Sequence, residues 1–157
     1  MLREGDRAPL FDLPSDGGDR VGLKALRGRW VVLYFYPKDD TEGCTIEAKE
    51  FSALAGAFAR AGAEVIGISP DSPKSHDKFK CKHELDLRLV SDEDKAVAEA
   101  YGVWVEKTMY GRKFMGVERA TFLISPKGRI ERIWRKVAPK GHAEAVLAEL
   151  AERDSSA

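Results

Sequence analysis

Residues 31–47 decide the fold: Val-Val-Leu-Tyr-Phe-Tyr-Pro-Lys-Asp-Asp-Thr-Glu-Gly-Cys-Thr-Ile-Glu. Val31 to Tyr36 is an unbroken run of β-branched and aromatic residues, which predicts a buried strand. Pro37 cannot continue a central strand, and the polar residues that follow it indicate a loop. Thr41 is a favourable N-cap, so we expect a helix to begin here with Cys44 in its first turn.

The position of Cys44 favours a reactive thiolate. At the amino end of a helix, unpaired backbone N–H groups and the helix dipole stabilise negative charge, and the thiolate is the nucleophilic form of cysteine. The alternative is a small buried hydrophobic residue, since free cysteines are often buried and inert. The spacing Pro37-x-x-x-Thr41-x-x-Cys44 favours the reactive interpretation. It places a hydroxyl close to the thiol, together with a proline that could shield the sulfur from water.

Composition excludes several classes of function. The 157 residues carry 26 basic and 26 acidic side chains, so the formal net charge is zero. Without a basic stripe, nucleic acid and anionic membranes are not expected partners. No apolar run approaches the about 18 residues of a membrane span, and the first residues lack the apolar core of a signal peptide. Two distant cysteines without zinc-type spacing predict a cytoplasmic protein with reduced thiols and no metal or other cofactor.

The rest of the chain alternates between strand and helix patterns. We expect strands at 11–13, 20–23, 64–69, 87–90, 119–124 and 129–134, and helices at 44–61, 70–83, 91–101 and 141–153. The first helix is expected to bury Ile46, Phe51 and Phe58. Residues 102–118 are rich in glycine and aromatics and are interpreted as a loop, whereas Pro126-Lys127-Gly128 predicts a hairpin turn. These patterns predict one α/β domain, residues 1–157, with a mixed sheet between helices and a frayed tail at 154–157.

Several motifs resemble those of the peroxiredoxin family, and within it the Q-type (bacterioferritin-comigratory-protein-like) branch. Besides Pro37–Cys44 with Gly43, Thr45 and Glu47, they are Gly5-Asp6-x-Ala8-Pro9-x-Phe11-x-Leu13, Gly102-Val103-Trp104, Tyr110–Gly116 and Arg119–Ile124. The resemblance covers nearly the whole chain. It implies a thioredoxin-like fold and the reduction of hydrogen peroxide or alkyl hydroperoxides by a cysteine thiolate.

The resemblance also assigns roles to residues around the thiol. Cys44 would attack the peroxide, Thr41 and Arg119 would hold it, and Pro37 would limit access of water. Arg119 stands where the family has its active-site arginine, although an arginine exposed at a sheet edge would fit the strand pattern too. Glu47 lies one turn after Cys44 and could orient Arg119, or it could be a solvated helix residue.

The resemblance also implies a second cysteine, which would convert the oxidised sulfur of Cys44 into a disulfide. Many Q-type members carry it five residues after the first, where this chain has Lys49, but a subset carries it on a later helix, which Cys81 matches. Cys81 is therefore the expected resolving cysteine, and an incidental cysteine is the alternative. The resemblance further implies thioredoxin or a similar dithiol as the reductant, and a monomer.

Two other functions use the same residues. A one-cysteine peroxidase or a non-catalytic redox sensor would each need only Cys44. A thiol–disulfide oxidoreductase would need a Cys-x-x-Cys motif, which the sequence lacks. The histidines at 76, 83 and 142 lack ligand spacing and are interpreted as surface residues. Trp30 and Trp134 are interpreted as packing residues, and Trp104 with residues 110–115 as a cover of the core or a wall of the site.

Overall fold

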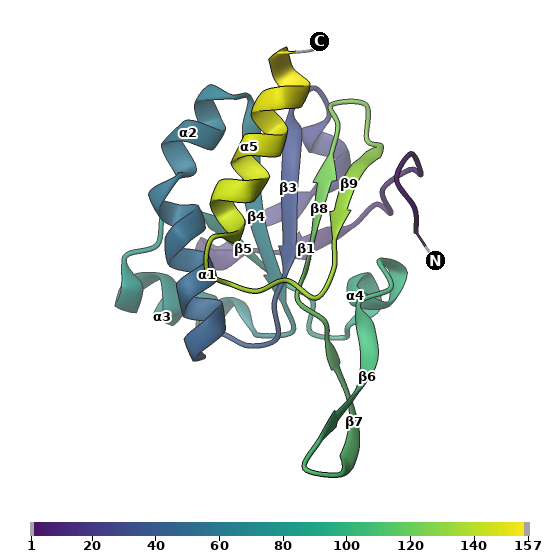
Figure 1. The fold of residues 1–157 in the computed structure, drawn as a ribbon. Coiled ribbons are helices and arrows are strands. Elements are labelled where there is room, and N and C mark those ends of the chain that lie inside the picture. The colour runs from purple at the N-terminus through teal and green to yellow at the C-terminus, as the bar shows by residue number, and fades with distance from the viewer. Residues whose placement is uncertain (1, 156–157) are drawn as a thin grey trace.

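A five-stranded sheet forms the centre of the molecule in the computed structural model, which describes residues 2–155 (Figure 1). Its strand order is β5-β4-β3-β8-β9. β3 is parallel to β4, which is parallel to β5, while β8 is antiparallel to both β3 and β9. The bounds are β3 Trp30–Phe35, β4 Ala63–Ser69, β5 Arg88–Ser91, β8 Ala120–Ile124 and β9 Ile130–Trp134. The mixed sheet agrees with the prediction from the sequence.

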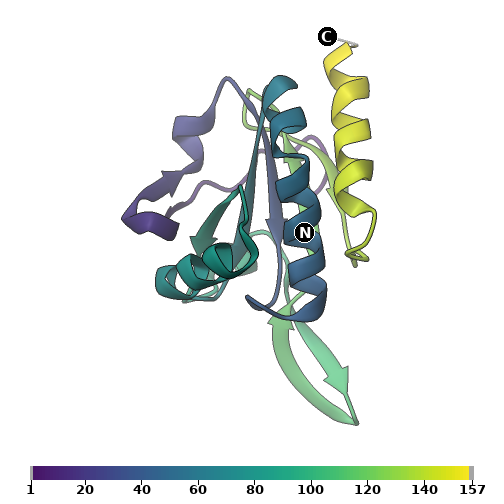
Figure 2. The same ribbon diagram turned by 90° about the vertical axis from the view of Figure 1, so that its left-hand side faces the viewer.

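Hydrophobic residues pack on both faces of this sheet, as the unbroken apolar run in β3 predicts. Val32 and Tyr34 contribute to one cluster, with residues of α1, α2, α3 and α5, and Val31 and Leu33 contribute to the other. The N-terminal segments and α4 cover that second face. The N-terminal segments lie on the side away from α5 (Figure 2). The remaining bounds are β1 Asp12–Pro14, η1 Asp16–Gly18, β2 Arg20–Gly22, η2 Leu23–Leu26, α1 Glu42–Ala53, α2 Ala55–Arg60, α3 Pro73–His83, α4 Ala96–Ala100 and α5 His142–Ser155. None of the helices described up to Ser155 is long and apolar enough to cross a membrane.

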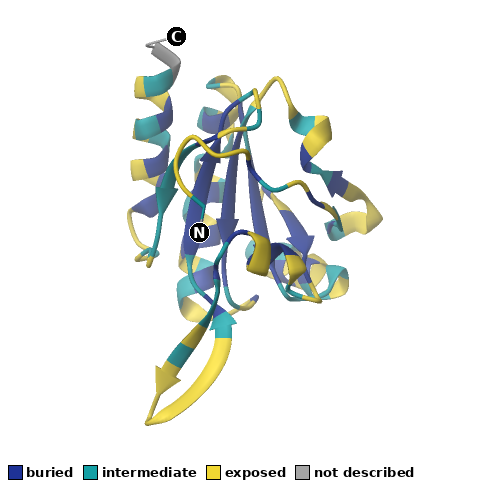
Figure 3. Ribbon diagram, turned by 90° about the vertical axis from the view of Figure 1, so that its right-hand side faces the viewer, coloured by how far each residue is buried: buried dark blue, intermediate teal, exposed yellow. Residues whose placement is uncertain are grey.

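The interpretation of residues 102–118 as a loop is wrong. They form a hairpin of β6 (Trp104–Met109) and β7 (Arg112–Val117) that extends away from the sheet and is mostly exposed (Figure 3). Tyr110 and Gly111 have φ angles of 52° and 76°, and positive φ at both central residues suits the two-residue turn of a tight hairpin. Because Tyr110 at the tip is 97% exposed, this tip covers no core.

The first predicted helix is two helices, with a break at Leu54 between α1 and α2. Phe51 and Phe58 are buried as expected, but Ile46 is exposed and Glu47 is buried in its place. At the other end of the chain, α5 continues to Ser155 and so includes the first two residues of the expected tail. Residues 156 and 157 of the expected tail lie outside the described part of the chain.

The histidines are not surface residues. His76 is 0% and His142 is 7% exposed, and His83 is half-buried. Each has a hydrogen-bond partner distant in the sequence: Asp39 for His76, Asp40 for His83 and Thr121 for His142. These contacts satisfy the polar ring nitrogens in the interior, which the sequence pattern does not reveal.

Candidate active site

The sheet brings Cys44 and Arg119 to the same edge. β3 leads into the loop before α1, and Phe35 near its carboxyl end pairs with Ala120 of the antiparallel β8. Arg119 immediately precedes β8, so it lies at the carboxyl end of β3, where Cys44 occupies the first turn of α1. Residues 75 positions apart in the sequence therefore meet.

Arg119 donates hydrogen bonds to two buried side chains of α1. Its Nη2 lies 3.4 Å from Cys44 Sγ, and its Nη1 lies 2.8 Å from Glu47 Oε1. Cys44 is 1% exposed and Glu47 is 0% exposed. Burial lowers the pKa of Arg119, but the negative charges of Cys44 and Glu47 outweigh it, and the net shift is upward. The guanidinium is thus a fixed cation that donates to the sulfur and is oriented by a carboxylate.

Glu47 is held in an environment that disfavours its charge. Burial raises its pKa from 4.5 to about 7, although Arg119 acts in the opposite direction. Its second oxygen, Oε2, is buried without a hydrogen-bond partner. Such an arrangement is costly to the fold, which indicates that the carboxylate is kept for its contact with Arg119.

Replacing Glu47 with Gln should change how stability depends on pH. Between pH 4.5 and about 7 the folded protein holds the Glu47 proton more tightly than the unfolded chain, so stability falls as pH rises through this window. At 1.36 kcal/mol per unit of pKa, the loss is roughly 3 kcal/mol. Glu47→Gln cannot ionise, so urea unfolding at pH 5 and pH 8 should show a smaller loss in the variant. Equal losses in both proteins would contradict the shifted carboxyl.

Thr41 and Pro37 frame the loop before Cys44 without a direct bond to its sulfur. Thr41 is the backbone N-cap of α1, and its carbonyl accepts from the N–H of Thr45 at 2.8 Å. Its hydroxyl donates to the carbonyl of Lys38 at 2.8 Å. Pro37 is half-buried directly after the run that ends at Tyr36. The hydroxyl oxygen of Thr41 therefore keeps its position through Lys38 and not through the thiol.

Gly43 is a residue whose role the sequence analysis missed. A Cβ at this position would lie 3.0 Å from Arg119 Nη2 and 3.2 Å from Cγ of Pro139. Both distances are shorter than ordinary contacts, so a side chain here would push the guanidinium away from Cys44. A glycine in the first turn of a helix is intrinsically unfavourable, and that was the signal available in the sequence.

Cys81 is apart from this cluster. It is exposed on α3, Cys44 is buried, and both are free thiols. The buried side of α3 carries Phe79, and Cys81 follows two positions later, about 200° around a helix of 3.6 residues per turn. Its sulfur therefore lies on the outer side of α3.

Two further titratable residues respond to Arg119. Burial lowers the pKa of His142 from 6.5 to about 4, and the charge of Arg119 adds to this effect. Burial and Arg119 also lower the pKa of Lys107 on β6, while Cys44 raises it. The middle of β6 thus brings a second cation close enough to interact electrostatically with the site, which the loop interpretation did not anticipate.

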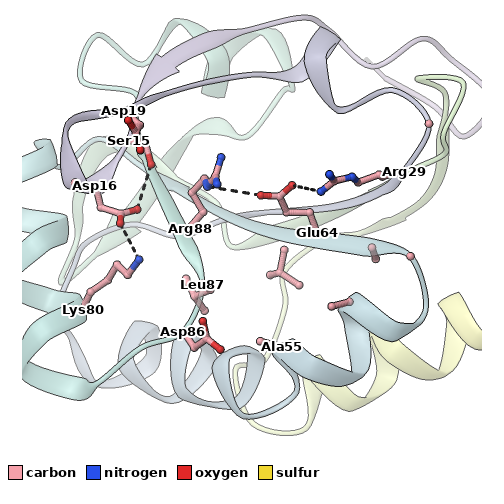
Figure 4. A pocket seen from close by; sticks show the side chains of 16 residues that line it. Ser15, Asp16, Asp19, Arg29, Ala55, Glu64, Lys80, Asp86, Leu87 and Arg88 are labelled. Carbon is pink, nitrogen blue, oxygen red and sulfur yellow. Dashed lines mark hydrogen bonds and ion pairs between the residues drawn. The ribbon is translucent and has the colours of Figure 1, made fainter.

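A large hollow in the described part of the chain lies elsewhere. Its volume is about 680 Å³, and neither Cys44 nor Arg119 lines it (Figure 4). Five of its charged groups form ion pairs with one another: Lys80 lies 2.7 Å from Asp16, and Glu64 lies between Arg29 and Arg88. Among residues 2–155, no cluster of histidine, cysteine or acidic side chains could hold a metal ion. The thiol with its arginine is therefore the candidate site.

Comparison with known proteins agrees with this geometry. The AhpC/TSA family model matches residues 4–133. Peroxiredoxin Bcp of Xanthomonas campestris is 51% identical over 145 residues, covering 91% of each chain. The chain belongs to the AhpC/TSA family, as a peroxiredoxin of the Q or Bcp type.

Solved structures of this peroxiredoxin type share the fold. Peroxiredoxin Q of X. campestris superposes with a TM-score of 0.88 at 49% identity, covering 92% of this chain and 91% of the other. The X. campestris bacterioferritin comigratory protein gives 0.88 at 48% identity, covering 92% of both chains. These relations confirm the predicted thioredoxin-like fold and the prediction of a thiol peroxidase.

Proposed function

We propose that Cys44 is the peroxidatic cysteine and that Arg119 holds the peroxide against it. The thiolate forms an S–O bond with the terminal oxygen while the O–O bond breaks. The sulfur loses two electrons and becomes a sulfenic acid, and the leaving oxygen takes a proton and departs as water or an alcohol. The observation that supports this best is the 3.4 Å contact between Arg119 Nη2 and the Cys44 sulfur at the start of α1.

The surrounding residues are assigned supporting roles. Arg119 and the backbone N–H groups at the start of α1 stabilise charge that develops on the peroxide oxygens. Glu47 orients Arg119. The Thr41 hydroxyl oxygen accepts a hydrogen bond from the bound peroxide, and Pro37 limits the access of water to the Cys44 sulfur. Alkyl hydroperoxides are the proposed substrates beside hydrogen peroxide. The X. campestris bacterioferritin comigratory protein, which is 48% identical, was studied for its alkyl peroxide reduction activity.

Cys81 is the proposed resolving cysteine. Its thiol attacks the sulfenic sulfur of Cys44, an S–S bond forms, and water leaves. A disulfide requires Cα atoms within about 7 Å and directed Cβ atoms. Because Cys81 lies on the outer side of α3 and Cys44 is buried, we expect the start of α1, the end of α3 or both to unwind. Hydrogen exchange should show lower protection there after oxidation, with Val31–Tyr36 still protected.

Replacing Cys81 with Ser should separate the two chemical steps. One equivalent of peroxide should oxidise Cys44 at the wild-type rate, because Arg119 and α1 are untouched. Steady turnover with thioredoxin, thioredoxin reductase and NADPH should fall at least tenfold, and mass spectrometry should find a sulfenic acid. Full turnover in Cys81→Ser would favour a one-cysteine peroxidase.

The wild-type protein in this coupled assay also tests the sensor alternative. Sustained peroxide consumption identifies an enzyme, whereas a single oxidation without turnover identifies a non-catalytic sensor. The same proposal includes thioredoxin or a similar dithiol as the reductant. It also includes a monomeric state, a cytoplasmic location and a single domain over residues 1–157.

A further inference from the structure

Two neighbouring aspartates in the loop before Cys44 bind α3 in different ways. The inner one, Asp39, is 7% exposed. Its Oδ2 lies 2.7 Å from His76 Nδ1 and accepts from Ser75 Oγ at 2.8 Å, and its Oδ1 accepts from the Tyr36 hydroxyl at 2.6 Å. This contact ties the loop to the first half of α3.

The inner contact is a buried hydrogen-bonded pair. His76 is 0% exposed, and its second ring nitrogen, Nε2, lies 3.0 Å from the carbonyl oxygen of Val90. Both ring nitrogens therefore lie within hydrogen-bond distance of oxygen atoms, Asp39 Oδ2 and the Val90 carbonyl. Breaking these contacts would leave buried polar groups without partners, which is unfavourable.

The outer aspartate, Asp40, makes contacts of another kind. It has a φ of 60° and accepts from Lys82 Nζ at 2.7 Å and from His83 Nε2 at 2.8 Å. The hydrogen bonds that Asp40 accepts from His83 and from Lys82 lower its pKa. Its side chain is 42% exposed, that of Lys82 is 62% and that of His83 is 16%, so all three reach water, which can replace these contacts at less cost than those of the buried Asp39–His76 pair. They hold the last turn of α3, directly after Cys81.

We propose that the Asp39–His76 pair is a fixed anchor and that Asp40 with Lys82 and His83 is a releasable latch for disulfide formation. The inference rests on the proposed role of Cys81 as the resolving cysteine. Local opening takes the route of lowest free energy. The exposed latch releases before the buried anchor, and its release frees the turn that carries Cys81.

The anchor also explains how the two thiols meet. Cys44 and Cys81 are 37 residues apart in the chain, but Cys44 is five residues from Asp39 and Cys81 is five residues from His76. An extended five-residue segment spans at most about 17 Å. With the anchor intact, both sulfurs stay on short tethers to one point, which keeps their effective concentration high after unwinding.

The first test compares Asp40→Asn with Lys78→Gln. Asparagine tolerates the left-handed φ of residue 40 and removes the charge of the latch. Lys78 lies one turn before Cys81 and makes no ion pair among the described residues, so its variant controls for charge near that thiol. In rapid-mixing experiments, Asp40→Asn should form the Cys44–Cys81 disulfide two- to fivefold faster than wild type. Oxidation of Cys44 by peroxide should keep its rate, and Lys78→Gln should match wild type in both steps.

The second test follows the three histidine rings by NMR in the wild-type protein. Oxidation to the disulfide should shift the His83 ring signals and leave the His76 ring signals in place. Loss of the His76 signals on oxidation, or an unchanged disulfide rate in Asp40→Asn, would overturn the anchor and latch while Cys81 remains the resolving cysteine. Mass spectra of the oxidised wild type without a Cys44–Cys81 disulfide would overturn the proposed resolving role of Cys81 and this inference together.

Discussion

Cys44→Ser should abolish peroxide reduction. A serine hydroxyl is almost entirely protonated at neutral pH and supplies very little nucleophilic anion. The substitution is close in size and keeps a group that can accept from Arg119, so the buried site should retain its shape. The coupled assay with thioredoxin, thioredoxin reductase and NADPH should show less than a few per cent of wild-type turnover.

The variant retains Cys81, which makes the control important. If Cys44→Ser still consumes peroxide, the double variant with Cys81→Ser shows whether the exposed thiol is responsible. Activity that survives in Cys44→Ser and disappears in the double variant would assign the peroxide step to Cys81. The expected result is that both variants are equally inactive while their thermal unfolding stays close to that of wild type.

The sequence predicts the part of the site that local patterns determine. An apolar run, a proline and an N-cap residue specify a strand, a loop and a helix start, and these place Cys44 where the structure has it. The pairing of Arg119 with Cys44 depends on the antiparallel register of β8 against β3. That register is a long-range property, so the residue was identified through the family resemblance.

Other features could not be predicted because distant partners create them. Glu47 is buried where Ile46 was expected, since its carboxylate binds Arg119, which a helical pattern cannot encode. His76 is buried because Asp39 and the Val90 carbonyl satisfy its ring from other elements. The hairpin at 104–117 has little apolar burial, so the pattern of buried residues that identified the other strands is missing.

Arg119→Met should slow the reaction with peroxide by one to several powers of ten. Methionine keeps most of the stem but removes the charge and the hydrogen bond to Cys44 Sγ. Each tenfold loss corresponds to about 1.4 kcal/mol of barrier, and a hydrogen bond to a charged group contributes about 1.5–3 kcal/mol. The thiolate absorbance of Cys44 at neutral pH should fall as well, because the adjacent cation that favours the anion is gone.

The matched controls separate this effect from damage to the fold. Arg119→Met leaves Glu47 buried without its cation, so the substitution should also be made in the Glu47→Gln background, where no carboxylate is left unpaired. Lys107→Met removes a cation near the site that makes no hydrogen bond to the sulfur, and it should cost much less activity. If Arg119→Met with Glu47→Gln keeps the thiolate absorbance and peroxide rate of Glu47→Gln alone, Arg119 does not activate Cys44. A loss of activity seen only in the single variant Arg119→Met would then reflect the unpaired carboxylate of Glu47.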